Sequence, residues 1–572
     1  MIRAGWQCYW VDTATQTISI NATNRKLYYS KPDDSGGVVR HPSERRRQAV
    51  KVAFAIQRKS LMKSMTRHRM TLLLYAAIFA TGTMLVAAQD APPATNQNHE
   101  VAIKHEPGVI RTPAAAATPR INGAGIFGVR PDHPFFYHIP ATGNRPMEFS
   151  ADNLPDGLTL DSRTGTITGK LSKIGDYLVT FHAKNSLGTG DKKFKIVVGE
   201  TIALTPAMGW NSWNHYAGKI TQDIVLENAK AMVDSGLINH GWSYVNIDDT
   251  WQGKRGGEFF GIQGNKKFPD IKGLCDQIHA MGLKFGIYST PWQTSYAWFT
   301  GGSSDSTNGQ WKASKHIAQY HFTTNDANQW AAWGVDYLKY DWYPIQLPET
   351  LEMADALRHS GRDILFSLSN GMNLTNGPTI GKIANSWRTT GDIKANWNSM
   401  SRQGFGQDKW RPYSSPGHWN DPDMLEIATA ESKQPGLTPD EEYTHMTLWC
   451  LICSPLLLAN DLSHMDAFTL NLLENDEVIA VNQDSLGDQA VTVVHDGDAR
   501  VYAKKLEDGS CAVGLFNTGT NSITVTMKWS DLKIKGTHAV RDLWRQKDLG
   551  KFKNEFSLPV VAHSGELVKI AP

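Results

Sequence analysis

Short apolar runs alternate with longer segments of helical pattern across residues 201–485, and this alternation constrains the fold more than any other feature. The strand-like runs are AMGWN (207–211), SYVNID (243–248), KFGIY (284–288), DYLKYD (336–341) and ILFSL (364–368), and further strands are expected near 385–387, 417–420 and 455–459. Strand–helix alternation over about 285 residues matches the size of a (β/α)8 barrel. The sequence therefore predicts an α/β protein with a TIM barrel at its centre.

Two β-rich domains are expected on either side of the barrel. Residues 118–200 contain alternating runs separated by turn signals, which favours a small β-sandwich, and the stretch LPDGLTLDSRTGTITG resembles the immunoglobulin-like modules of secreted bacterial enzymes. Residues 486–572 return to a period of two with glycine-bearing turns, which predicts an antiparallel β-sandwich. Residues 89–117 are rich in Ala, Pro and Gln, which indicates a flexible linker.

The N-terminal part of the chain carries a targeting pattern. Residues 65–88 combine Arg67 and Arg69, an apolar run and a small-residue end, which predicts a secretory signal peptide. The run is short for a membrane span, so no membrane span is expected after cleavage. Residues 1–64 have no clear periodicity and are left as an uncertain extension. The expected location of the protein is therefore outside the cytoplasm, either periplasmic or secreted.

Charge and cysteine content exclude several classes of function. The whole chain carries 58 basic and 56 acidic residues, and residues 1–88 hold 14 of the basic and 4 of the acidic ones, so the remainder has a formal charge of 44 − 52 = −8. An acidic mature chain lacks the basic stripe that nucleic-acid binding requires. Cys450 and Cys453 lie within an apolar run without a second pair, so they are interpreted as buried structural residues and no metal or cofactor is predicted.

Acidic residues collect where the barrel strands are expected to end. The set is Asp248, Asp249, Asp341, Asp392, Asp421, Asp423 and Asp461. Catalytic groups of TIM barrels lie at the carboxyl ends of the strands, whereas a single Asp there would serve equally well as a helix cap. Fifteen tryptophans fall within 201–485, which favours rings that stack on sugar faces as well as core packing. Carboxylates and tryptophans without a His/Cys cluster indicate glycoside chemistry by paired carboxylates.

Longer motifs bring a resemblance to a known family. TPAMGWNSWN (205–214), YVNIDDTWQ (244–252), YLKYD (337–341), WRTTGDI (387–393) and HWNDPDML (418–425) resemble glycoside hydrolase family 27 in order and spacing. This is the family of α-galactosidases and α-N-acetylgalactosaminidases. The resemblance implies a retaining exo-glycosidase that releases terminal α-linked D-galactose from oligo- or polysaccharides.

The resemblance also implies roles for individual residues. Asp341 matches the nucleophile and Asp392 the general acid/base, and their carboxyl groups should lie roughly 5 to 5.5 Å apart in a retaining enzyme. Lys339, two residues before Asp341 on the same strand face, is expected to keep that carboxylate ionised. Arg388 matches a residue that contacts the sugar near its 2-substituent.

Substrate binding is inferred in the same way. Asp248 and Asp249 match an acid pair that accepts hydrogen bonds from O4 and O6 of a galactose-configured ring. Trp213 matches the platform under the ring and Tyr288 a wall of the site, while Asp423 supports the 2-position side. Asp421 and Asp461 are interpreted as structural.

Two departures from the family leave alternatives open. The family usually has a disulfide that joins the loop after strand three to the second residue after the nucleophile, whereas this chain has aromatic residues there. The loop after strand five reads FSLSNGM (366–372), in which Ser369 superficially fits the N-acetylgalactosaminidases. An α-N-acetylgalactosaminidase, another exo-activity such as a β-L-arabinopyranosidase, and a non-catalytic sugar-binding protein therefore remain as alternatives. The oligomeric state is not predicted.

Overall fold

The computed structural model describes residues 10–13, 16–20, 27–29, 108–429 and 436–572. The chain divides into two units, Met1–Glu100 and Val101–Pro572. In the first unit, β1 (Trp10–Thr13), β2 (Gln16–Ile20) and β3 (Leu27–Tyr29) form an antiparallel sheet in the order β1-β2-β3. The segment predicted as a signal peptide, 65–88, lies outside the described residues. None of the described helices is both long and apolar enough to cross a membrane.

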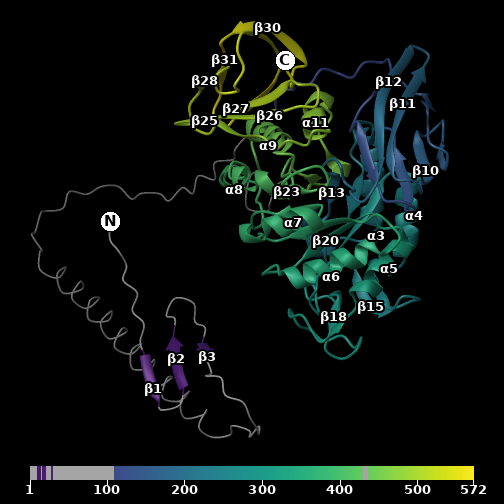
Figure 1. Cartoon of the computed structure of the whole chain (residues 1–572). Coiled ribbons are helices and arrows are strands. Elements are labelled where there is room, and N and C mark those ends of the chain that lie inside the picture. The colour runs from purple at the N-terminus through teal and green to yellow at the C-terminus, as the bar shows by residue number, and fades with distance from the viewer. Residues whose placement is uncertain (1–9, 14–15, 21–26, 30–107, 430–435) are drawn as a thin grey trace, which may run out of the picture. The chain divides into compact units, whose positions relative to one another are not determined.

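The second unit is built around an eight-stranded parallel sheet, which confirms the predicted barrel (Figure 1). Its strands are β13 (Met208–Asn211), β14 (Tyr244–Asn246), β17 (Lys284–Ser289), β20 (Tyr337–Asp341), β21 (Leu365–Ser369), β22 (Ser386–Arg388), β23 (Trp419–Asp421) and β24 (Leu456–Leu458). They pair in chain order, and β24 returns to β13. A parallel bridge between Leu425 and Leu458 closes the remaining gap beyond β23.

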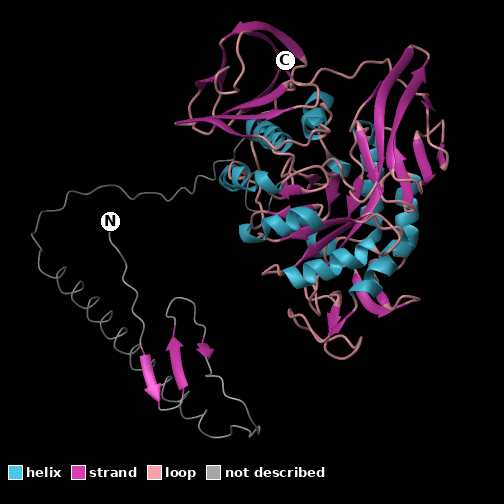
Figure 2. Cartoon of the chain, in the orientation of Figure 1, coloured by secondary structure: helices cyan, strands magenta, loops and turns pink. Residues whose placement is uncertain are grey.

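Helices follow most of the barrel strands and surround them (Figure 2). The helices are α2 (Trp213–Tyr216), α3 (Gln222–Asp234), α4 (Ile271–Ala280), α5 (Thr323–Trp333), α6 (Leu347–Arg358), α7 (Gly377–Ile383), α8 (Trp397–Gly404), α9 (Pro439–Leu451), α10 (Ala467–Leu473) and α11 (Asp476–Asn482). Local sequence explains several starts. Thr438 and Glu441 form a capping box at α9, and the side chain of Asp270 accepts from the amide of Gly273 at α4.

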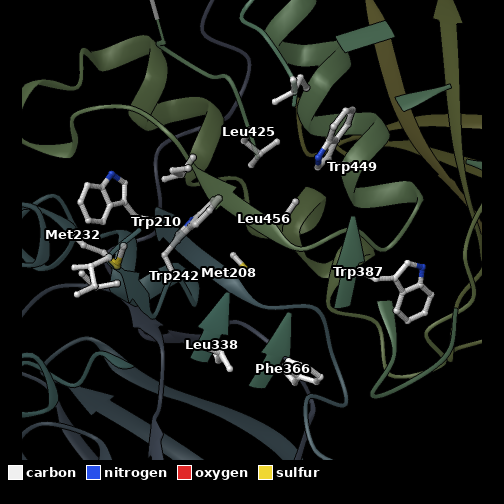
Figure 3. Packing of buried hydrophobic residues seen from close by; sticks show 14 of the residues in the cluster. Met208, Trp210, Met232, Trp242, Leu338, Phe366, Trp387, Leu425, Trp449 and Leu456 are labelled. Carbon is white, nitrogen blue, oxygen red and sulfur yellow. The ribbon is translucent and has the colours of Figure 1, made fainter. Parts of the chain in front are cut away.

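The main hydrophobic core lies between the barrel strands and the surrounding helices (Figure 3). Leu338 and Phe366 face outward from their strands into this core, together with Trp210, Trp242 and Trp387. A smaller cluster that includes Tyr337 and Leu365 lies apart from it. Because side chains alternate across a strand, β20 places Tyr337, Lys339 and Asp341 on the face opposite Leu338.

The immunoglobulin-like module packs against the amino-terminal ends of the barrel strands. Its strands are β4 (Arg120–Ile121), β5 (Ile126–Val129), β6 (Pro134–His138), β7 (Ala141–Thr142), β8 (Glu148–Asp152), β9 (Leu158–Leu160), β10 (Thr166–Lys170), β11 (Gly175–Asn185) and β12 (Gly188–Val198). They form two main sheets, β6-β10-β9 and β5-β12-β11-β8, around a separate core.

Specific contacts hold this module on the barrel. Arg130 and His133 both bind the carboxylate of Asp363 just before β21, at 3.0 and 2.9 Å. The Lys284 ammonium, at the start of β17, lies 4.5 Å from the ring centroid of Phe127. A cavity of about 130 Å³ remains between the two domains, with Phe127, Lys284 and Asp363 among its lining residues. The module is therefore a docked part of the second unit.

The end of the predicted linker is ordered, which corrects the expectation for residues 108–117. Arg111 binds Asp440 of α9 at 3.0 Å and Glu566 of β32 at 3.1 Å, and its guanidinium lies 3.9 Å from the Tyr443 ring centroid. Thr112 is also buried and exchanges hydrogen bonds with Asn471. An Ala/Pro-rich composition does not reveal such contacts, because they depend on side chains more than 300 residues away. Residues 89–107 lie outside the described part of the chain.

The C-terminal domain is an antiparallel sandwich, as predicted. Its strands are β25 (Val491–Asp496), β26 (Ala499–Lys505), β27 (Cys511–Asn517), β28 (Ile523–Lys528), β29 (Thr537–Asp542), β30 (Lys547–Lys553), β31 (Glu555–Val560) and β32 (Gly565–Ile570). The larger sheet has the order β25-β26-β27-β32-β29-β30, and β28 pairs with β31. This domain packs on α9, so it buttresses the barrel from the side.

Candidate active site

The carboxyl ends of the barrel strands bring most of the predicted site residues together. Asp341 ends β20, Ser369 ends β21, and Arg388 ends β22. In the parallel register, Asp341 is paired with Ser369, so the two side chains start from adjacent positions. Neighbouring parallel strands that end at the same level bring their last residues to one end of the barrel.

Asp341 is buried and accepts two hydrogen bonds from neutral donors. The hydroxyl of Tyr288 donates to its Oδ2 at 3.0 Å, and the side-chain amide nitrogen (Nδ2) of Asn370 donates to its Oδ1. Burial raises the pKa of Asp341 to about 6, against the opposing effect of the positive charges of Lys339 and Arg388. The carboxylate is therefore ionised at neutral pH but poorly solvated, which suits a nucleophile.

Lys339 binds Asp248 directly. Its Nζ lies 2.7 Å from Oδ2 of Asp248, and the same oxygen accepts from Asn211 at 3.0 Å. Although burial lowers it, the negative charges of Asp248 and Asp341 raise the pKa of Lys339 above its ordinary value. The Lys339 charge also favours the ionised form of Asp341, so one cation serves two carboxylates while it is hydrogen-bonded to Asp248.

Asp249 is held by backbone amides. Its Oδ1 accepts from the amide of Thr250 at 2.6 Å, and its Oδ2 accepts from the amide of Ala297 at 2.8 Å. Burial raises the pKa of Asp249, and the hydrogen bond from Ser295 opposes that rise. The loop after β17 therefore positions one member of the acid pair, and the ion pair with Lys339 positions the other.

Arg388 connects Asp392 with Asp423. Its Nη2 lies 3.2 Å from Asp392 and 2.7 Å from Asp423. The two acids differ in exposure, because the Asp392 side chain is 83% exposed and the Asp423 side chain 4%. Asp423 also accepts from the amide of Ile393 at 2.8 Å, which ties the segment that carries Asp392 to the loop after β23. Asp392 is thus the open, solvent-facing acid of the site.

The remaining predicted residues lie around this group. Trp213 is half-buried beside the small cluster that contains Tyr337 and Leu365. Asp421 is buried, and burial raises its pKa to about 6 while Arg388 opposes the rise. Asp461 lies apart at the start of a short 3-10 helix, where it accepts from the amide of Ser463 as a cap. Its structural interpretation agrees with that place.

The tryptophans serve mainly as core residues. Nine of those within 201–485 are fully buried: Trp210, Trp242, Trp251, Trp330, Trp342, Trp387, Trp410, Trp419 and Trp449. Their number therefore reflects packing between strands and helices more than sugar stacking. Trp298 and Trp311 differ, because both are exposed on the segment between β17 and α5.

Two residues next to the proposed nucleophile, Asn370 and Tyr296, did not emerge from the sequence as candidates for the site. Asn370 donates both to Asp341 and, at 3.2 Å, to the hydroxyl of Tyr296. Its φ of 76° lies in the left-handed region, which Asn tolerates better than most residues. The Asn370-Gly371 pair was a signal for such a turn.

Within the described residues, no group of three or more His, Cys, Asp or Glu side chains is arranged to hold a metal.

Comparison with known proteins places the chain in a family. Residues 205–484 match the family described as Alpha galactosidase A, and residues 496–570 match the Alpha galactosidase C-terminal beta sandwich domain. Alpha-galactosidase 2 of Arabidopsis thaliana is 39% identical over 378 residues, which cover 65% of this chain and 90% of that protein. The chain belongs to the alpha-galactosidase family. It is accordingly a glycoside hydrolase of family 27, and the family is retaining.

Solved structures extend the likeness of this alpha-galactosidase family member beyond the barrel. Residues 118–199 match an immunoglobulin-like domain family. A Bacteroides fragilis structure with 33% identity and a TM-score of 0.74 covers 80% of this chain and 98% of its own. A family 27 β-L-arabinopyranosidase from Geobacillus stearothermophilus is 29% identical with a TM-score of 0.56, and covers 65% of this chain and 97% of that one.

Proposed function

We propose that the protein releases terminal α-linked D-galactose from oligo- or polysaccharides by double displacement. The observation that carries this proposal is the pair of acids with contrasting surroundings at one end of the barrel. Asp341 is buried among neutral donors, whereas Asp392 is exposed beside Arg388. Two carboxyl groups in different environments can take the two different roles that glycoside hydrolysis needs.

Asp341 is the nucleophile in this mechanism. Its carboxylate attacks the anomeric carbon and forms a glycosyl-enzyme in which the configuration is inverted. The hydroxyl of Tyr288 and the side-chain amide of Asn370 hold the two carboxylate oxygens, so the attacking group enters the reaction already oriented. Lys339 and Arg388 favour its ionised form.

Asp392 is the acid/base. It protonates the departing glycosidic oxygen in the first step and removes a proton from water in the second, which restores the original configuration. Its exposure allows water to enter after the leaving group departs. Arg388 donates to Asp392 and Asp423 and thereby fixes the side of the site that receives the sugar's 2-substituent.

Asp248 and Asp249 select the galactose configuration. Both are buried, and hydrogen bonds to the oxygens of each carboxylate fix its orientation. Such a pair can accept from an axial O4 and from O6 together, which favours a hexose over a pentose. Trp213 and Tyr288 supply aromatic surface for the ring.

The loop after β21 borders the side of the site that is proposed to receive the 2-substituent. Met372 is buried in the main hydrophobic core, and its backbone amide donates to the carbonyl of Arg388 at 2.8 Å. Ser369 is buried as well and leaves the alternative α-N-acetylgalactosaminidase activity to be tested. We also propose export of the protein through residues 65–88, which rests on the sequence pattern alone.

Hydrolysis of three chromogenic substrates by the purified protein from residue 89 onward tests the proposed function. The substrates are the 4-nitrophenyl α-galactoside, α-N-acetylgalactosaminide and β-L-arabinopyranoside. We expect the galactoside to be hydrolysed at least about tenfold faster, because a misfit at one substituent changes transition-state binding by about 1 to 3 kcal/mol. A preference for either other substrate would overturn the assignment, and no hydrolysis at all would favour a sugar-binding protein.

A further inference from the structure

One tryptophan of the barrel stands at the edge of the site with its ring in solvent. Trp298 is 55% exposed, whereas most barrel tryptophans are fully buried. Its φ of 65° lies in the left-handed region, where a bulky residue is a rare outlier. A strained and exposed tryptophan contributes little to stability, so its position calls for a functional explanation.

The two residues before Trp298 contact the site at two points, one at Asp249 and one beside Asp341. The amide of Ala297 donates to Asp249 at 2.8 Å. The hydroxyl of Tyr296 accepts at 3.2 Å from Asn370, which in turn donates to Asp341. These contacts fix the chain on either side of the proposed galactose position, and Trp298 follows directly.

The acids also indicate on which side of the galactose Trp298 lies. Burial raises the pKa of Tyr296 above its ordinary value, and the negative charges of both Asp341 and Asp392 add to the rise. Tyr296 therefore lies near the acid/base as well as the nucleophile. The leaving group departs on the acid/base side. Lys315 contacts the rings of both Tyr296 and Trp298, so the Trp298 ring lies on that side as well.

Lys315 holds the aromatic pair in place. Its Nζ lies 4.7 Å from the ring centroid of Trp298 and 5.0 Å from that of Tyr296. Cation–π contacts of this length restrain the indole, yet more than half of the residue stays in solvent. A restrained, exposed indole offers a flat surface of the kind on which the apolar face of a pyranose packs.

We propose that Trp298, restrained by Lys315, is the platform for the leaving-group sugar. Trp298 then favours α-galactosides whose leaving group is a sugar ring over those whose leaving group is small. This inference rests on the proposed function, and it concerns only the first half of the reaction. Once the leaving group has departed, the glycosyl-enzyme is the same for every α-galactoside.

Two substrates separate the platform from the chemistry. In α-D-galactosyl fluoride the leaving group is too small to reach Trp298, whereas raffinose carries a sugar there. For Trp298→Ala we expect kcat/KM for raffinose to fall by roughly three- to tenfold, as the loss of one aromatic contact implies, and kcat/KM for the fluoride to stay unchanged. Trp298→Phe keeps a ring and should retain most of the raffinose activity.

Trp311→Ala is the matched control, because Trp311 is an exposed tryptophan on the same segment. It should leave both substrates unchanged. An equal loss on both substrates in Trp298→Ala would show that the residue only supports the Asp249 loop and would overturn the platform, as would no loss on raffinose. If the wild-type protein hydrolyses neither substrate, the proposed function itself fails, and that result is distinct from both others.

Discussion

The ammonium of Lys339 is bonded to Asp248 at 2.7 Å, although Lys339 stands two residues before Asp341 on one face of β20. The two acids therefore share one cation. Asp248 receives the direct contact, and Asp341 receives only the longer-range effect of the charge. Burial raises the pKa of Asp341 to about 6, and the Lys339 charge lowers it without cancelling that rise.

The acid limb of the pH profile should report Asp341. Its pKa is raised to about 6, and only the ionised carboxylate can attack, so kcat/KM should fall as the pH drops below about 6. Lys339→Met removes a charge that lowers this pKa, so the limb should move to higher pH. The measurement is kcat/KM for 4-nitrophenyl α-galactoside between pH 4 and 8. A limb that stays in place in Lys339→Met would contradict the assignment.

Removal of the Asp341 charge should stabilise the fold while it abolishes turnover. The folded-state pKa of about 6 exceeds the ordinary 3.8, so the folded protein binds the proton more tightly than the unfolded chain does. The free energy of unfolding then falls as the pH rises from 4 through 6, by about 3 kcal/mol at most.

We therefore expect Asp341→Asn to raise Tm at pH 7.5 and to leave it unchanged at pH 3.5, with kcat reduced by at least about a thousandfold. Thermal unfolding of both proteins at the two pH values provides the measurement. A variant less stable than the wild type at pH 7.5 would show that the buried charge of Asp341 does not destabilise the folded protein.

Asp392→Ala should be rescued by azide. Without the acid/base, the glycosyl-enzyme waits for an activated water, and azide needs no proton removal. The exposed position of Asp392 leaves space for a small anion. Because Asp341 attacks with inversion, azide should give α-galactosyl azide, which product analysis by NMR identifies. The β-anomer, or a lack of rescue, would exclude Asp392 from this role, and Asp421→Ala serves as a control that azide should not rescue.

The effect of Asp363→Asn on the free energy of unfolding should show how much the contact between the immunoglobulin-like module and the barrel stabilises the protein. Burial tends to raise the pKa of Asp363, but the His133 hydrogen bond and the Arg130 charge lower it below its ordinary value. Its stabilising contribution is therefore present above pH 4 and lost as the pH falls through the folded-state pKa. Asp363→Asn should cost about 2 kcal/mol at pH 7 by denaturant unfolding, and the cost should shrink as the pH falls below 4.

Asp176→Asn is the comparison for this prediction, because Asp176 forms an exposed ion pair with Lys195 on the same module. It should change the free energy of unfolding by less than about 1 kcal/mol. Equal effects of the two substitutions would mean that the contact between module and barrel adds little stability.

Local pattern predicted the barrel well because strand signals depend on adjacent residues. The run YLKYD alternates with period two, and β20 places Lys339 and Asp341 on one face as that period requires. The partner of Lys339 did not follow from the pattern, because Asp248 lies just after a different barrel strand, β14. The role of Asn370 was not predicted for a related reason. It depends on the left-handed backbone at Asn370 and on the hydrogen bond from its side chain to Asp341.

The tryptophans show what composition alone does not predict, namely which of these residues are buried and which are exposed. Composition correctly marked them as concentrated in the barrel, but a count does not separate a core ring such as Trp387 from an exposed one such as Trp298. The distinction arises from the face of the strand or the turn on which each residue falls. The docking of the module through Asp363 was equally invisible, since it joins residues more than 200 positions apart.

Arg111 determines where a force applied to the N-terminal segment would act on the folded protein. Its side chain binds Asp440 on a barrel helix and Glu566 on a strand of the C-terminal sandwich. Tension applied ahead of residue 108 would therefore reach these two anchor points before it reached the immunoglobulin-like module. An enzyme tethered by its N-terminal segment would carry the load through Arg111, whose contacts lie on α9 and β32 rather than on β20, the strand that ends at Asp341.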